Sequence, residues 1–320
     1  MILASTDDLR KHVAIAKSLH FPDVEPYIDQ AVYQFTERYV GDLHLTLAEP
    51  ATGENADILN KARNILQNAL SNFVLYLYTP IGSVIFDSSG FGNAESDTRS
   101  KLEWTQIRDL QRGFLMAGHT AMDRLLSVLE KNKTIFPTWA ESEQYTESKE
   151  LLVSNTKTFN DCYTIYDSRQ TYLALKPAMR QIEDQFLYTF LCPELITFLK
   201  EGEPSGVQLQ VKKYLQKAIV AFTIAKVVNE GVFIIDGSSI KIKFDTLPSD
   251  KVYNPDYGKP ADFLTQTSLR QKEYGQNYLS MAENLIKANP EEFTQCESPI
   301  IVKEEEGGFM PYNTKGVLGL

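Results

Sequence analysis

With 320 residues, 43% of them hydrophobic and 23% charged, the chain has the composition of a folded protein with two ordinary domains or one large one. Its 42 acidic and 32 basic residues give a formal net charge of −10 at pH 7. Proteins that wrap nucleic acid or coat an anionic membrane need clustered positive charge, so the composition disfavours both classes. No run approaches the roughly 18 apolar residues that a membrane-spanning helix needs.

The cysteines Cys162, Cys192 and Cys296 are odd in number and lie far apart in the sequence. We therefore expect no disulfide framework, and a reducing compartment. None of them has the CxxC partner of a structural zinc site, so we expect no metal there. Acidic residues follow the N-terminus too soon for a secretory signal, and we expect synthesis in the cytoplasm.

The first predicted elements are two helices. Apolar residues recur at steps of four, three and four from Ile28 to Tyr39, as on one face of an α-helix, and Gly41 ends it. A second helix is predicted over about residues 56–78, with Pro80 ending it.

A predicted β-hairpin follows each of two such helices. The apolar run 84–86 precedes a glycine- and serine-rich turn, and residues 94–132 then have the pattern of one or two long, polar-faced helices. In the second half, an apolar run and a Gly-Ser-Ser turn precede alternating Ile240, Ile242 and Phe244. This alternation predicts a half-exposed ribbon, whose outer edge needs a partner or protective charge.

The two halves also share sequence. Residues 66–89 align with residues 215–238 at a constant offset of 149 without a gap, with eight identities in 24 positions. Chance would give only one or two, so we infer an internal duplication. The identical pairs are Leu66/Leu215, Gln67/Gln216, Ala69/Ala218, Phe73/Phe222, Gly82/Gly231, Ile85/Ile234, Asp87/Asp236 and Ser89/Ser238.

The predicted fold class is mainly α with short β-hairpins (α+β), built from two like modules. We predict a first module over residues 1–139, a helical linker over 140–159, a second module over 160–295 and an extended C-terminal tail over 296–320. The tail has paired glycines and isolated apolar residues, which suits either plain disorder or a segment that orders against a partner. The residues expected to bind partners are Phe309, Met310, Tyr312, Val317, Leu318 and Leu320 in the tail, and Ile240 and Ile242 on the second hairpin.

We predict no catalytic, cofactor or metal site. The chain has no phosphate-binding GxxxxGK loop and no GxSxG elbow, and its histidines lack metal-ligand spacing. These histidines are His12, His20, His44 and His119. We expect His12 and His20 on helix or loop surfaces, and His119 at a surface or packing position. Asp87 and Asp236 are equivalent in the repeat, but an aspartate that opens a turn usually accepts the turn's own backbone hydrogen bonds. Trp104 and Trp139 are expected either to anchor the packing or to lie in an interface.

Four stretches carry resemblances to two known families. STDDLRKHVAIAKSLHFPDVEPYIDQAVYQFTERYVGDLHLTL, followed by NKARNILQNALSNFVLYLYTP, resembles the head–tail connector (adaptor) proteins of tailed bacteriophages. In that family a short N-terminal element precedes an aromatic-bearing helix that ends near a glycine, and then an alanine-containing helix. FPTWAESEQYTESKELL and SRQTYLALKPAMRQIED are similar to an uncharacterised family of Bacteroidetes phages and prophages.

The resemblance implies a structural virion protein without enzymatic activity. Such a protein forms a homo-oligomeric ring in the phage neck, docked on the portal protein and on adjacent neck or tail proteins, after synthesis in the host cytoplasm. DNA passes through the ring without sequence-specific binding, and the negative charge suits a channel that must not retain phosphates. The alternatives are a monomeric or dimeric helical enzyme or regulator with a cleft between the repeats, and a nucleic-acid-binding regulator, which the charge disfavours.

Overall fold

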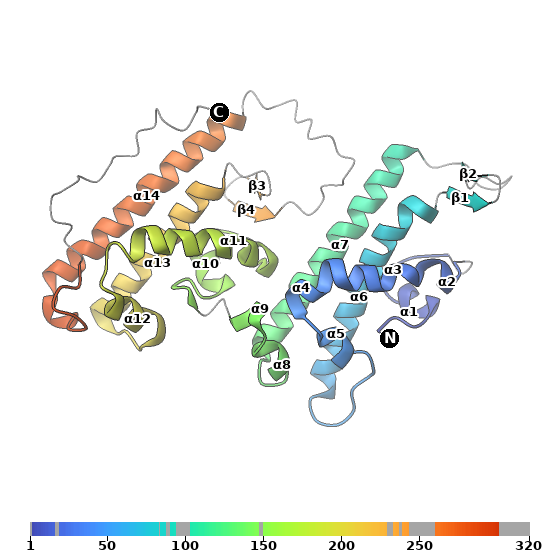
Figure 1. Cartoon of the computed structure of the whole chain (residues 1–320), viewed down its shortest axis with the longest axis horizontal. Coiled ribbons are helices and arrows are strands. Elements are labelled where there is room, and N and C mark those ends of the chain that lie inside the picture. The colour runs from blue at the N-terminus through green and yellow to red at the C-terminus, as the bar shows by residue number, and fades with distance from the viewer. Residues whose placement is uncertain are drawn as a thin grey trace.

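The computed structural model describes residues 2–16, 19–82, 84–87, 90–93, 103–146, 150–228, 233–236, 239–242 and 260–300. These residues form two groups of helices, each built around one long helical hairpin (Figure 1). The two hairpins are α6 with α7 and α13 with α14, and the two helices of each hairpin pack along one another. No helix of the described residues is both long and apolar enough to cross a membrane.

The first module contains short helices followed by its long hairpin. Its elements are α1 (Thr6–Arg10), α2 (Phe21–Val24), α3 (Pro26–Ala31), the π-helix η1 (Val32–Thr36), α4 (Glu37–Val40), α5 (Leu43–Thr46), α6 (Ala56–Gly82), β1 (Val84–Asp87), β2 (Gly90–Asn93), α7 (Trp104–Lys131), α8 (Pro137–Ala140) and α9 (Glu143–Thr146). The predicted stop at Gly41 is confirmed, because Gly41 takes a φ of 52° just after α4. The predicted stop at Pro80 is wrong, since α6 includes Pro80 and continues to Gly82.

The second module repeats this order. Its elements are α10 (Thr156–Cys162), α11 (Arg169–Ile182), the π-helix η3 (Glu183–Leu187), α12 (Pro193–Glu201), α13 (Gly206–Val227), β3 (Phe233–Asp236), β4 (Ser239–Ile242), α14 (Pro260–Ala288) and the 3₁₀ helix η4 (Pro290–Glu292). Each module has one π-helical turn at the same place, before its long hairpin. Because π-helical turns are rare, their recurrence supports the duplication.

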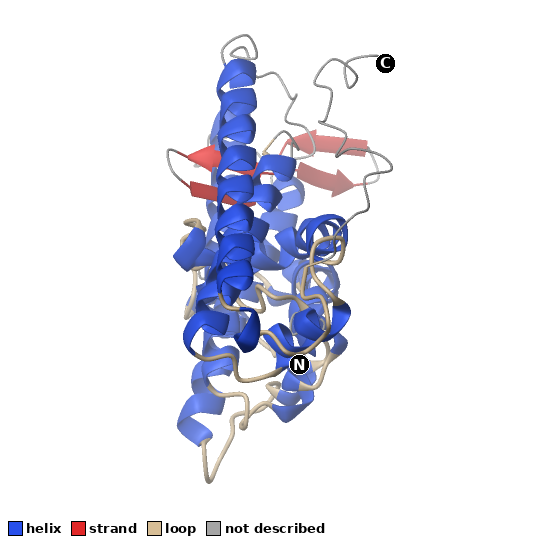
Figure 2. Ribbon diagram, turned by 90° about the vertical axis from the view of Figure 1, so that its left-hand side faces the viewer, coloured by secondary structure: helices blue, strands red, loops and turns tan. Residues whose placement is uncertain are grey.

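The strands form two antiparallel ribbons, both in the upper half of the molecule in Figure 2. In one ribbon Val84 pairs with Asn93 and Asp87 with Gly90. In the other, Phe233 pairs with Ile242 and Asp236 with Ser239. No larger sheet forms among the described residues, so the mainly helical, duplicated architecture is confirmed and all-α describes it better than α+β.

Each core contains a pair of stacked phenylalanine rings. Phe35 lies on Phe73 with ring centroids 4.3 Å apart and planes 10° from parallel, and Phe186 lies on Phe222 with the same distance and angle. A glycine of the hairpin's second helix fits against the far ring in each module: a Cβ built on Gly118 would lie 2.5 Å from Phe73 Cε1. Gly275 has the same relation to Phe222. The absence of a side chain thus lets the two helices approach closely over the phenylalanine.

The start of each module is also repeated, which the sequence alignment did not reach. Gln67 donates from Nε2 to the carbonyl oxygen of Ile2 at 2.8 Å, and the aligned Gln216 donates to the carbonyl oxygen of Leu152 at 3.0 Å. Ile2 therefore corresponds to Leu152. Part of the segment expected as a linker, residues 151–153, is buried in the second core.

The two modules follow one another in the same orientation. In Figure 1 the two hairpins lean the same way, with α1 to α3 at one outer end of the molecule and α14 at the other. The modules meet where α7, the last long helix of the first module, contacts α11, an early helix of the second. The contact therefore joins two different surfaces of a similar fold.

Candidate functional site

The structure does not describe most of the predicted partner-binding residues. Phe309, Met310, Tyr312, Val317, Leu318 and Leu320 lie outside the described residues, as does Phe244. Ile240 and Ile242 are described in their backbone alone, where they pair with Ile235 and Phe233. Asp87 and Asp236 occupy the same end position in two separate ribbons.

Three other residues that the sequence singled out are now placed. Trp139 is 4% exposed and donates from Nε1 to the carbonyl oxygen of Tyr39 at 3.1 Å, so it anchors the packing. Trp104 is 56% exposed at the beginning of α7. His44 directs Nδ1 to the carbonyl oxygen of Gly41 at 3.3 Å, within its own turn.

His119 lies at the centre of the contact between α7 and α11, which we call the joint between the modules. His119, on α7, is 4% exposed and has its Nδ1 2.8 Å from Oε1 of Gln170 on α11. Gln170 in turn donates from Nε2 to the carbonyl oxygen of His119 at 2.8 Å. Since the amide nitrogen of Gln170 donates, its oxygen accepts, and the ring proton of His119 must be on Nδ1.

This buried position determines the charge of the histidine. Burial, which penalises the charged imidazolium, lowers the pKa of His119 to about 4, with a smaller contribution from the positive charge of Arg38 and an opposing one from the hydrogen bond with Gln170. His119 is therefore neutral at neutral pH. Its ring makes T-shaped contacts with Phe73 and Phe35 of the first core, with centroid distances of 5.0 and 6.0 Å.

Two acids of α7 extend the joint along the helix. Asp123 accepts from the backbone N–H of Gln170 at 2.9 Å and from Oγ of Ser168 at 2.8 Å, while burial raises the pKa of its carboxyl group. Seven residues further on, about two helical turns, Glu130 accepts from Nε of Arg169 at 2.8 Å. Asp123 thereby satisfies free N–H and O–H groups at the start of α11.

Serine, histidine and aspartate thus meet at the joint, but not as a catalytic triad. In a triad the histidine activates the serine and the aspartate orients the histidine. Here Ser168 donates directly to Asp123, and the protonated Nδ1 of His119 is bound by Gln170. These hydrogen bonds position one module on the other.

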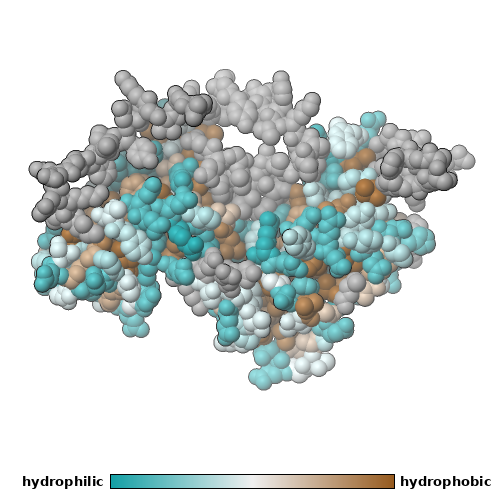
Figure 3. Space-filling model, in the orientation of Figure 1, coloured by the Kyte–Doolittle hydropathy of each residue, from teal (hydrophilic) through white to brown (hydrophobic). Residues whose placement is uncertain are grey.

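A pocket of about 280 Å³ opens beside this contact. It is lined by residues of both modules, namely Leu126, Glu130, Lys131, Lys133, Tyr145, Ser154, Asn155, Lys157, Arg169, Tyr172 and Leu173. Three of these groups are already bound within the chain: Arg169 binds Glu130, and Tyr172 donates to the carbonyl oxygen of Val153, which lies outside the lining. The described part of the face in Figure 3 is mostly hydrophilic, with apolar side chains in small areas between helices.

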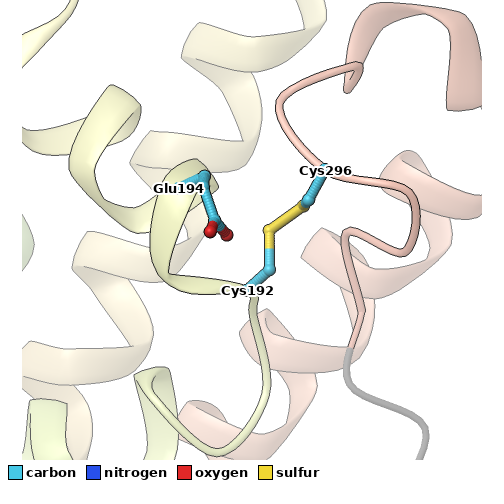
Figure 4. A group of neighbouring side chains, drawn as sticks. All are labelled: Cys192, Glu194 and Cys296. Carbon is cyan, nitrogen blue, oxygen red and sulfur yellow. A yellow bond between two sulfur atoms is a disulfide. The ribbon is translucent and has the colours of Figure 1, made fainter.

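A disulfide joins Cys192 and Cys296, which corrects the expectation that the cysteines remain unpaired (Figure 4). The fold brings the two residues together across 104 positions of sequence, because the segment after α14 returns to the beginning of α12. Beside the bond, the backbone N–H of Cys192 donates to the carbonyl oxygen of Pro299 at 3.1 Å. Cys162 is the free cysteine, and burial raises the pKa of its thiol to about 11.

The same two cysteines and Glu194 form the one group of potential metal ligands that is close enough for a single ion among the described residues. The carboxylate of Glu194 points toward the disulfide in Figure 4. Sulfur binds metals as thiolate, so a disulfide at this place does not provide those ligands.

Comparison with known proteins identifies a family. Residues 26–149 and 184–303 match the family of unknown function DUF6712, one segment in each module. No curated protein and no solved structure matches the chain. The two matched segments cover well over half of the sequence and agree with its duplication. The chain therefore belongs to DUF6712, a family of unknown function.

Proposed function

We propose that this protein is a structural component of a bacteriophage virion that forms a ring at the head–tail connector, or neck. In this role it joins the portal to downstream tail components around the DNA channel. The sequence resemblance to connector proteins and to a phage and prophage family suggests this setting.

The observation that carries the proposal is the joint between the modules. α7 of the first module packs on α11 of the second through His119, Asp123 and Glu130, so two different surfaces of one repeated fold are in contact. Contacts of this heterologous kind generate rings when their rotation closes, and open filaments when it does not. A chain that already contains one such heterologous contact between its modules is suited to forming a ring by repeating this contact between chains.

The charge supports the same role. A ring multiplies the net charge of −10 per chain, and a negative channel keeps few phosphate contacts with passing DNA. A protein that bound DNA tightly would need an excess of basic residues. We therefore expect the purified protein to show only weak, salt-insensitive association with duplex DNA.

Negative-stain imaging and sedimentation of the full chain, alone and with the portal protein of the same phage, test the proposal. We expect rings, either free or formed on the portal. Particles that stay monomeric at every concentration and do not bind the portal would contradict it. A portal that recruits the chain in one copy only would also contradict the ring.

An enzyme or regulator with a cleft between the repeats remains the second candidate, and the pocket at the joint favours it. Cations and an acid from both modules, including Lys131, Lys157 and Glu130, line this cavity of about 280 Å³. Thermal unfolding in the presence of a small-molecule library discriminates between the two functions. Saturable stabilisation that Lys157→Ala abolishes would favour the cleft, since a bound ligand stabilises the folded state.

A further inference from the structure

Among the described residues, one surface of the duplicated fold is covered in the first module and exposed in the second. An offset of 157 relates α7 to α14: it brings Gly118 onto Gly275, both of which pack against a core phenylalanine. It also brings Asn132 onto Asn289, which donate in the same way to the carbonyl oxygen four residues earlier, at 2.7 and 2.8 Å. The two helices are thus equivalent residue by residue.

The face of α7 that contacts α11 contains His119, Asp123, Leu126 and Glu130. The offset of 157 places Gln276, Ser280, Glu283 and Lys287 on the corresponding face of α14, which we call the α14 outer face. The spacing by three, four and seven residues keeps each set on one side of its helix. His119 is 4% exposed, whereas Gln276 and Ser280 are exposed.

The complementary surface is partly exposed in the first module. η1 and η3 begin 151 residues apart, and this offset places α11 opposite α2 and α3 and aligns Gln170 with Leu19. Pro22 and Pro26, which follow Leu19, are exposed. We call Leu19 with α2 and the beginning of α3 the α2–α3 face. It lies at the opposite outer end of the molecule from α14 (Figure 1).

We propose that the α14 outer face of one copy binds the α2–α3 face of a second copy, repeating between chains the contact that α7 and α11 make within the chain. This inference rests on the proposed function in assigning the surfaces of the ring contact. A second copy is the occupant because one chain carries both halves of the contact, one at each end.

The side chains of the two faces fit such a contact. In the chain the acid Glu130 of the first module binds the cation Arg169 of the second. On the α14 outer face Lys287 replaces Glu130, and the exposed residues of α2 include Asp23. Lys287 is bound by Glu283 of the same face at 2.6 Å, so the α14 outer face carries charges of both signs. Leu269, seven residues before Gln276 on the same side of α14, is 49% exposed and supplies apolar surface for burial.

Engineered cysteines test the proposal in full chains that also carry Cys162→Ser. Since Gln170 contacts His119, the corresponding pair between copies is Leu19 with Gln276, and we expect a Leu19→Cys, Gln276→Cys variant to form a ladder of covalent oligomers on mild oxidation. Mixing the two single variants should give covalent dimers only. The matched control combines Leu19→Cys with Met281→Cys, because Met281 is 42% exposed on another side of α14.

The outcomes separate the two proposals. Rings that form while only the control pair cross-links would overturn the assigned surfaces and leave the ring intact. A ladder without rings or portal binding would support the surfaces and contradict the neck function. A chain that neither cross-links nor associates, with or without portal, would overturn both. Folding of each variant is checked by its helical circular dichroism, because Leu19 is partly buried.

Discussion

The segment that follows the long hairpin is held to its module by a hydrogen bond in the first module and by a disulfide in the second. In the first, Trp139 follows α7 and reaches back to the carbonyl oxygen of Tyr39 at the end of α4. In the second, the equivalent residue is Cys296, which follows α14 and is bonded to Cys192 before α12. The buried indole of Trp139, which donates one hydrogen bond, thus occupies the position that the disulfide-bonded Cys296 has in the second module.

The difference teaches which part of the fold is fixed and which part is free. The phenylalanine stack and its glycine are the same in both modules, with identical ring distances. The contact that holds the segment after the hairpin differs between the modules. A buried ion pair also joins Lys200 and Glu183, 2.6 Å apart, in the second module. The offset of 151 places Val32 at the position of Glu183 in the first module, so this ion pair has no counterpart there. The core of the long hairpin is therefore common to both modules, whereas the hydrogen bond, the disulfide and the ion pair around it are each found in one module only among the described residues.

The largest expected effect comes from the shared stack. Phe73→Ala and Phe222→Ala each remove a buried ring and leave a cavity, so we expect each to lower the free energy of unfolding by about 3–5 kcal/mol. Denaturant unfolding followed by circular dichroism measures this. Similar losses would show that the two cores are energetically alike, and a loss under 1 kcal/mol (roughly the effect of a surface change) in either would contradict the structural equivalence.

The disulfide gives the next largest effect, and only in the second module. Cys296→Ser removes a link across 104 residues and should lower the free energy of unfolding by about 2–4 kcal/mol. A reducing agent should destabilise the wild type equally and leave the variant unchanged. Cys162→Ser is the matched control, because Cys162 is not bonded. A wild type that is indifferent to the reducing agent would show that the bond does not stabilise the fold.

The packing glycines provide a smaller test of the same symmetry. A Cβ at Gly118 or Gly275 meets a phenylalanine ring, so Gly118→Ala and Gly275→Ala should each cost about 1–3 kcal/mol by overpacking. Gly113→Ala, in the same helix as Gly118, meets nothing within 4 Å and should stabilise the chain by about 0.5–1 kcal/mol. Thermal unfolding of the three variants decides this, and a neutral Gly275→Ala would break the comparison.

The smallest expected effect distinguishes the joint from the open face. His119 has a pKa of about 4 in the folded state and about 6.5 in the unfolded state, so the unfolded state binds more protons between these values. The free energy of unfolding therefore decreases as the pH is lowered below about 6.5. Between pH 7.5 and 5.5 we expect a loss of about 1 kcal/mol from this residue. Asp123 acts in the opposite direction, because burial raises the pKa of its carboxyl group.

His119→Gln, which copies the residue at the equivalent position 276, should remove this dependence. The readout is the slope of the unfolding free energy against pH, so a general loss of stability in the variant does not obscure it. An unchanged slope would show that other groups govern the response.

Much of the helical architecture could be predicted, because apolar periodicity and the repeated Leu66–Asp87 and Leu215–Asp236 segments reflect local rules. The beginnings of the modules escaped detection, since only one glutamine hydrogen bond and a few apolar residues connect Ile2 with Leu152. Such short matches have no statistical weight in sequence alone.

The joint and the disulfide could not be predicted. His119 and Gln170 lie 51 positions apart, and their contact depends on how two complete modules pack. The partner of Cys192 is likewise fixed only by the return of the chain after α14, and an odd number of widely spaced cysteines favoured the opposite conclusion. A histidine next to a glycine in a helix carries no signal of burial.

The disulfide also determines where mechanical load enters the molecule. A pull on the chain beyond residue 300 reaches Cys296 before it reaches α14, and the covalent bond passes it to the N-terminal end of α12. The long hairpin of the second module is thereby shielded from traction applied at the C-terminal end. Reduction would redirect that force into α14, and a single-molecule extension trace would then lengthen by the released loop.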